Sequence, residues 1–311
     1  MRLQSNEQSG QAAVVVIVVV LLACLIGPLI LHFTQKGHNQ LPLNVAEAYP
    51  ANGEIAPGEV FATALLTIID HELSGGTGWR PNDFILWGPK LWADNNANRQ
   101  LGIIQAARES TRIFKNHLTK VSATEFDPNL VVADTVLRND AAKFWFPSAE
   151  SKFGEAVEAL RRYVAGLKTS SPTSKAITHR NIELIRLFQE WTDLLGDAHA
   201  NLFKMHESDG RGIPLWKTDD YFYHAQGFAH VMYHLNEAIR REYQNELKDR
   251  PEVTKLFEEV AYALHEAALL KPFMVVNGSP SGLFANHRRN LDVYVVEARQ
   301  KMYSIREELE K

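Results

Sequence analysis

The chain has 311 residues, of which 45% are hydrophobic and 23% are charged, and this balance excludes a disordered, collagen-like or disulfide-stapled protein. Lys and Arg total 33 against 37 Asp and Glu, so the formal charge is -4 and no nucleic-acid partner is expected, because a broad positive field is missing. The single cysteine, Cys24, rules out an internal disulfide and any zinc site built from several cysteines.

An uncharged apolar segment follows the first eleven residues. It runs from Ala12 to Leu31, which at 1.5 Å per residue matches the hydrocarbon thickness of a bilayer. A cleaved signal peptide would carry an apolar run of only about 7–15 residues and end in a small-residue cleavage site. We therefore predict a short cytoplasmic tail over 1–11 and a retained single transmembrane helix over 12–33, with the lipid bilayer as its partner.

Basic residues do not orient this segment, because Arg2 on one flank is balanced by Lys36 on the other. A short amino-terminal tail before a long domain is typical of a signal anchor, and long domains are translocated largely regardless of their charge. The chain from about residue 34 onward is therefore expected outside the cytoplasm.

The region after the apolar segment begins with a predicted tether over 34–56, where Gly and Pro occur among polar residues without periodicity. From 57 to 311 apolar residues recur at helical spacing. Only 273–276 has the character of a strand, and it is too short to build a sheet. The sequence thus predicts an all-α fold with an elongated multi-helix domain over 57–311.

Several helix boundaries are marked by capping residues. Asp127 followed by Pro128 is typical of a helix start, as are Ser148 and Pro251. A repeat of about 3.5 residues over 177–205 predicts a long helix packed along its whole length on a neighbour.

A run of Lys, Thr, Ser and Pro over 168–174 separates two groups of these predicted helices. Such a polar run is typical of a linker, and we take 168–174 as the candidate boundary between two lobes.

A candidate metal site is formed by His230, His234 and Glu237. A spacing of i, i+4 and i+7 places all three on one stripe of a helix, where they would suit a divalent metal. No carboxylate lies between the two histidines, so the catalytic HExxH arrangement is absent. The favoured interpretation is a half-buried, hydrogen-bonded histidine pair, with no cofactor predicted and a divalent metal as the alternative.

Asp70, His71 and Glu72 form a second group with acid/base character near the end of a predicted helix. Successive helical residues point about 100° apart, so these three side chains do not share one face. We interpret them as a solvated helix end with a capping histidine.

Trp79, Trp87 and Trp92 occur in a stretch rich in Gly, Pro and Asn. Because tryptophan has a large apolar face and one donor, the three form a candidate binding surface for a sugar or a hydrophobic peptide. The alternative is a loop that covers the helical core, and this interpretation is favoured.

Three stretches carry a resemblance to a known family: Asp83–Trp92, Ala106–Arg112 and Asp197–Leu202. They resemble the proteobacterial domain of unknown function 2333 family, and the likeness extends over nearly the whole chain. The resemblance implies a single-pass inner-membrane protein of Gram-negative bacteria with a helical periplasmic domain. It implies no activity, so no functional residue is carried over.

Signatures of the common enzyme classes are missing from the sequence: there is no Gly-x-Gly-x-x-Gly, no Walker loop and no Gly-x-Ser-x-Gly. We therefore expect a non-enzymatic binding protein, a scaffold or accessory component of the cell envelope with an envelope protein or the cell wall as partner. Two alternatives stay open. One is a cell-wall hydrolase that depends on a metal or on carboxylates, and the other is a periplasmic sensor of a small ligand.

Overall fold

The structure is a computed structural model that describes residues 10–24, 26–27, 30, 41–83, 94–120, 125–278 and 285–311. Within these residues the regular elements are helical, and extended pairing is limited to two isolated β-bridges. The all-α prediction is confirmed. The helices are α2 (Val45–Ala48), α3 (Glu59–Ser74), α4 (Asn95–Ile113) with the π-helical η1 (Phe114–Leu118), α5 (Pro128–Leu137), α6 (Ala149–Lys168), α7 (Asn181–Phe203), α8 (Leu215–Glu242), α9 (Pro251–Leu269) and α10 (His287–Glu310).

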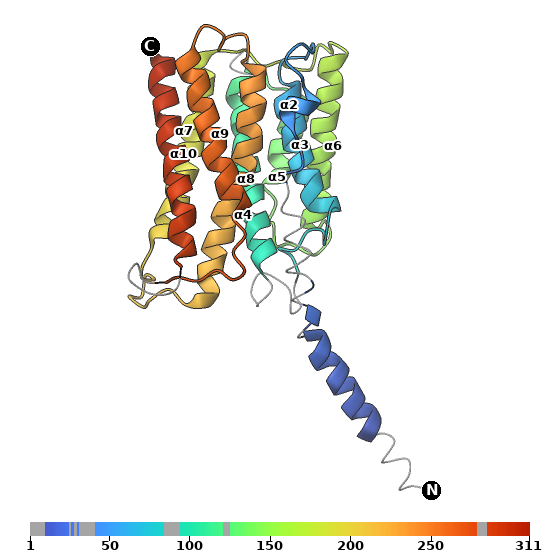
Figure 1. Cartoon of the computed structure of the whole chain (residues 1–311). Helices are drawn as coiled ribbons and strands as arrows, with labels where there is room; N and C mark the ends of the chain where they lie inside the picture. The colour runs from blue at the N-terminus through green and yellow to red at the C-terminus, as the bar shows by residue number, and fades with distance from the viewer. Residues whose placement is uncertain are drawn as a thin grey trace.

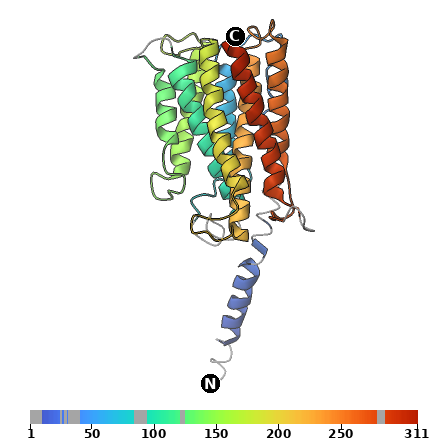
Figure 2. The ribbon, with the colours of Figure 1, turned by 90° about the vertical axis from the view of Figure 1, so that its left-hand side faces the viewer.

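The long helices stand side by side in an up-and-down bundle (Figures 1 and 2). α8 lies at the centre, because it packs against α3, α4, α7, α9 and α10. α5 and α6 form the flank beside α3, and α7, α9 and α10 form the opposite flank. This alternation of direction fixes which connections meet at each end of the bundle.

The predicted helix starts at Asp127, Ser148 and Pro251 are confirmed. The Asp127 carboxylate accepts hydrogen bonds from the backbone amides of Asn129 and Leu130 at 2.8 and 3.2 Å. The Ser148 hydroxyl accepts one from Ser151, and Pro251 occupies the first turn of α9. These side chains satisfy amide groups that have no partner inside the helix, which is why the same residue types mark helix starts in the sequence.

The start of α3 is capped by a residue from far along the chain. Glu242, at the end of α8, accepts backbone hydrogen bonds from Gly58, Val60 and Phe61 at 2.9, 2.8 and 3.2 Å. Gly58 has a φ of +101°, in the left-handed region that favours glycine. Burial raises the pKa of the Glu242 carboxyl to about 7, although the three backbone bonds oppose that rise.

The crossing of α4 and α8 depends on two glycines. A Cβ on Gly102 would lie 2.1 Å from the carbonyl oxygen of His224, and a Cβ on Gly227 would lie 2.3 Å from that of Arg99. Both obstacles are backbone atoms, so neither can rotate away. The missing side chains therefore let the two helices approach closely at this point.

Residues 41–56 of the predicted tether are folded against the bundle. Val45 in α2 is buried, and Leu41 and Leu43 pack on the same core. The Arg241 guanidinium donates to three backbone carbonyls of the segment 49–53, at 2.8 to 2.9 Å. The Gly and Pro residues of this segment therefore form turns in a part of the chain that packs on the bundle. Residues 34–40 of the predicted tether lie outside the described residues.

The linker 168–174 does not divide the core. One continuous cluster of buried apolar side chains includes helices on both sides of it, from α3 to α10. Its start is ordered by a hydrogen bond from the Ser171 amide to the Gly166 carbonyl, and the Tyr163 hydroxyl donates to the carbonyl of Lys175 just beyond it. The predicted lobe boundary is therefore a turn between two helices of a single core.

The amino-terminal helix over residues 10–24 lies apart from the bundle, at its lower end in Figures 1 and 2. Its apolar side chains are exposed, with Val14 and Leu21 at 60% and 62%. Residues 25, 28, 29 and 31–33 of the predicted span lie outside the described residues. Over the part of the chain that the structure describes, no helix combines the length and the apolar character needed to cross a membrane.

Candidate functional site

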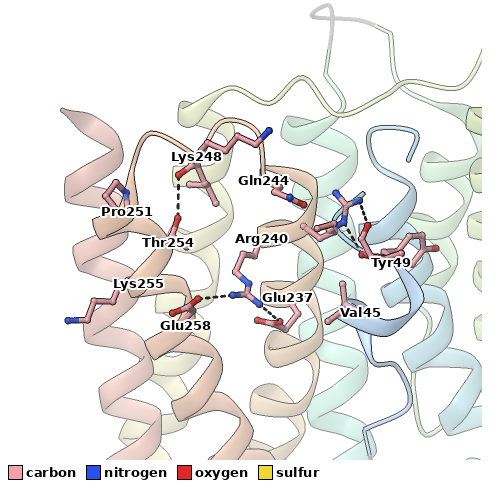
Figure 3. A pocket seen from close by; sticks show the side chains of 15 residues that line it. Val45, Tyr49, Glu237, Arg240, Gln244, Lys248, Pro251, Thr254, Lys255 and Glu258 are labelled. Carbon is pink, nitrogen blue, oxygen red and sulfur yellow. Dashed lines mark hydrogen bonds and ion pairs between the residues drawn. The ribbon is translucent and has the colours of Figure 1, made fainter. Parts of the chain in front are cut away.

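A surface groove lies between α2, the end of α8 and the start of α9 (Figure 3). Its volume is about 740 Å³, and its apolar lining includes Val45, Tyr49, Leu247 and Pro251. The up-and-down order places it near the upper end of the bundle in Figure 1, the end away from the helix over 10–24.

Charged side chains surround this apolar lining. Arg240 donates to Glu237 on its own helix at 2.9 Å and to Glu258 on α9 at 3.2 Å, as the dashed lines in Figure 3 show. Four cations and two carboxylates line the groove: Arg240, Arg241, Lys248, Lys255, Glu237 and Glu258. The formal charge of the lining is therefore positive by two, and both carboxylates are already paired with Arg240.

The predicted metal ligands are divided between the core and this groove. His230 and His234 are fully buried, with ring centroids 5.1 Å apart, whereas Glu237 bonds to Arg240 in the groove. Helical spacing brings the histidines together, whereas Glu237, further along α8, lines the groove beside α2 and α9. Among the residues described by the structure, no three His, Cys, Asp or Glu side chains gather in a way that would hold a metal ion.

The two histidines belong to a buried polar cluster between α3, α4 and α8. Arg99 donates to Glu72 at 3.0 Å and lies 3.1 Å from Nδ1 of His230, and its side chain and that of Glu72 are 0% and 1% exposed. Gln100 donates to the second carboxylate oxygen of Glu72 at 3.1 Å. The prediction of a solvated helix end is therefore wrong for Glu72, because α4 and α8 cover that face of α3.

Burial lowers the pKa of the His234 imidazole to about 3, and the nearby charges of His71, Arg99 and His265 lower it further. The ring is therefore neutral at pH 7. The arrangement ties three helices together through buried charges and hydrogen bonds.

Three aspartates gather at the starts of α4 and α8. Burial, followed by the charges of Asp220 and Asp219, raises the pKa of the Asp94 carboxyl to about 8. Asp94 and Asp220 are hydrogen-bonded to each other, and the Asn98 amide donates to Asp220 at 2.6 Å. Burial also raises the pKa of Asp219, to about 6. At neutral pH the pair thus consists of one carboxylic acid donating to one carboxylate.

Sequence reasoning did not find this carboxyl pair. Asp94 and Asp220 are 126 positions apart, and only the packing of α4 on α8 brings them together. The one available signal was the doublet Asp219–Asp220, and acidic residues at a helix start have an ordinary electrostatic explanation.

The predicted tryptophan surface is only partly covered by the described residues. Trp79 is 6% exposed, donates from Nε1 to the Ala141 carbonyl at 2.9 Å, and packs edge-on against Phe153. This tryptophan is therefore part of the core. Trp87 and Trp92 lie outside the described residues.

Comparison with curated proteins and comparison with solved structures each gave no match. A family model described as "Uncharacterized protein conserved in bacteria (DUF2333)" matches residues 4–210 and 188–311. The two matched ranges overlap and together span almost the full length. The chain therefore belongs to the DUF2333 family.

Proposed function

We propose that this protein is a membrane-anchored component of the bacterial cell envelope that acts without catalysis, as a scaffold or accessory subunit. The groove between α2, α8 and α9 supports this proposal best, and we assign to it the binding of a segment of a partner protein. Its apolar lining and its surplus of two positive charges suit a segment with apolar side chains and a few acidic ones.

The groove favours a protein segment over a small ligand because of how its charges are used. Pockets for small ligands present a few convergent polar groups that are free to bind. Here Glu237 and Glu258 both bond to Arg240, and Arg241 is occupied by backbone carbonyls. Of the lining, the apolar side chains and the Lys248 ammonium group stay available, and Lys255 has a 3.9 Å contact with Glu259 on its own helix.

Membrane attachment is part of the proposal. The uncharged run over 12–31 supports a single-pass anchor in the inner membrane, and the short tail before it supports a periplasmic bundle. The test replaces Cys24 with serine, adds one cysteine after Lys311, and applies a membrane-impermeant maleimide after permeabilising the outer membrane alone. Labelling is expected, and protection until the inner membrane is lysed would overturn the orientation.

Groove binding is tested with a photoreactive amino acid in place of Gln244, and a control probe in place of Glu158 on the exposed face of α6. The groove probe is expected to give one discrete crosslinked product in cells, and the control none. Reversing the rim charges with Lys248→Glu and Lys255→Glu should weaken the crosslink, whereas Lys152→Glu on α6 should not. Equal yields from both probes would refute the assignment.

The Asp94–Asp220 pair favours a second candidate function, a carboxylate-dependent hydrolase acting on the cell wall. An acid whose pKa is raised to about 8 beside an ionised carboxylate has the protonation states required for general acid and base catalysis. This candidate requires that the full chain cleave purified peptidoglycan and that Asp94→Asn abolish the cleavage without unfolding the bundle. A wild-type chain that cleaves nothing would refute it.

A further inference from the structure

Large apolar side chains are exposed mainly at one end of the bundle. Among the residues of the bundle that the structure describes, seven such side chains are more than 60% exposed: Trp145, Phe146, Met205, Trp216, Phe273, Met274 and Val293. All of them lie in the α5–α6, α7–α8 and α9–α10 connections or in the first two turns of α8 and α10. The up-and-down order places these three connections on the lower side of the bundle, and in Figure 2 the α5–α6 connection lies higher than the other two.

The upper end differs in this respect. Among the described residues of its connections and adjoining turns, the most exposed large apolar side chain is Ile182, at 52%. Single exposed apolar residues are ordinary, but a set confined to one end marks a contact surface. The helix over 10–24, which begins the predicted anchor, lies beyond this same lower end.

The chemistry of the lower end matches the boundary between lipid headgroups and acyl chains. Trp216 is followed by Lys217, and Phe203 by Lys204. The Arg289 guanidinium lies over the Phe203 ring, 3.4 Å from its centroid. Aromatic rings with a cation beside them are typical of membrane interfaces, where the ring enters the apolar layer and the charge stays in water.

We propose that the lower end of the bundle rests on the bilayer that holds the anchor, with Trp216, Phe273 and Met274 at the acyl boundary. The α7–α8 connection with the first turn of α8 carries three cations and two carboxylates, Lys204, Arg211, Lys217, Glu207 and Asp209. Because the net charge of this connection is small, we assign the contact to the exposed apolar side chains and expect zwitterionic lipid to suffice. This contact rests on the membrane attachment proposed above and adds a second, peripheral site to it.

The test uses the full chain with Cys24→Ser, reconstituted in zwitterionic vesicles. Single cysteines are introduced as Trp216→Cys, Phe273→Cys or Ile182→Cys and labelled with an environment-sensitive fluorophore. Trp216 and Ile182 are matched, because each is the second residue of its helix and both are exposed. Probes at 216 and 273 are expected to be quenched severalfold more by nitroxide-labelled lipid, and severalfold less by iodide, than the probe at 182.

Three other outcomes would each overturn the proposed contact with the bilayer, and they can be told apart. If the labelled chain floats with the vesicles but its three probes respond alike, the anchor stands and the contact is refuted. If the chain does not float, the anchor fails and the contact fails with it. If protection at 216 and 273 disappears when protein is diluted in excess lipid, a second copy of the chain covers this end instead of lipid.

Discussion

Replacing Gly227 with alanine should separate α4 from α8 at their closest point. The new Cβ would lie 2.3 Å from the Arg99 carbonyl oxygen and 2.8 Å from the Ile103 amide nitrogen. Contacts below 3.0 Å are not tolerated by carbon, and here both neighbours are main-chain atoms of a helix. One helix must therefore shift, which also disturbs the hydrogen bonds that Arg99 makes to Glu72 and His230.

Gly154 in α6 supplies the matched control, because a Cβ there meets nothing within 4 Å. Glycine to alanine at such a helical position stabilises by about 0.5–1 kcal/mol, since the unfolded chain loses freedom. The same gain applies at Gly227, but overpacking a tight core costs typically about 1–3 kcal/mol and occasionally more. Because that gain is common to both variants, they should differ in their free energy of unfolding by the overpacking cost alone, about 1–3 kcal/mol.

Thermal unfolding of the full chain in detergent, followed by circular dichroism at 222 nm, measures this difference. For domains of 150–250 residues, about 1 kcal/mol corresponds to a shift of about 2–4 °C in Tm. Gly154→Ala should unfold at or above the wild-type Tm, and Gly227→Ala several degrees below it. Equal Tm values for the two variants would refute the close crossing of α4 and α8.

Three further predictions concern buried ionisable groups, and each is checked by equilibrium unfolding. Glu72→Gln leaves the buried Arg99 guanidinium without its anion and should lower the free energy of unfolding by about 3–5 kcal/mol. The double variant Glu72→Leu with Arg99→Met should lose less stability than the sum of its two single changes. Additive losses would contradict a coupled pair. The Asp94 carboxyl has a folded pKa of about 8, above its unfolded value of 3.8, so the wild type should lose stability as pH rises from about 4 to 8. Asp94→Asn should therefore lose less stability than the wild type between pH 5 and 8. Parallel curves of unfolding free energy against pH would count against the raised pKa of Asp94. The His234 imidazole has a folded pKa of about 3, below its unfolded value of 6.5, so the wild type should lose stability as pH falls from 6.5 toward 3. His234→Phe should lose less stability over this pH range. The same loss in both proteins would contradict the prediction.

The fold was largely predictable, because apolar spacing and capping residues act locally. Asp127, Ser148 and Pro251 mark helix starts through hydrogen bonds and backbone geometry within one turn. The start of α4 at Asn95 was not predicted, because the segment Asn95–Leu101 shows no apolar periodicity and is held instead by polar contacts of Asn98 and Arg99. Local patterns do not report such long-range partners.

The candidate site was much less predictable. The groove is formed by α2, which sequence reasoning placed in a tether, and by the ends of α8 and α9, so its existence depends on packing between distant segments. The burial of Glu72 and the pairing of Asp94 with Asp220 are likewise decided by helices from elsewhere in the chain. Of the predicted metal ligands, His230 and His234 lie together because they share one helix. Glu237 instead lines the groove and bonds to Arg240.

The cap that Glu242 places on α3 sets an order for folding during synthesis. Glu242 is 184 positions beyond Gly58, so the amide groups at the start of α3 have no carboxylate to bind until α8 has emerged. At about 5–20 residues per second, the nascent chain waits about 10–40 s for this contact. Through that interval the start of α3 lacks its cap and the helix lacks the cover of α8, although α4 and α6, which also pack on it, are made earlier. The start of α3 is therefore made early and capped late, whereas the rest of the helix can already pack on α4 and α6.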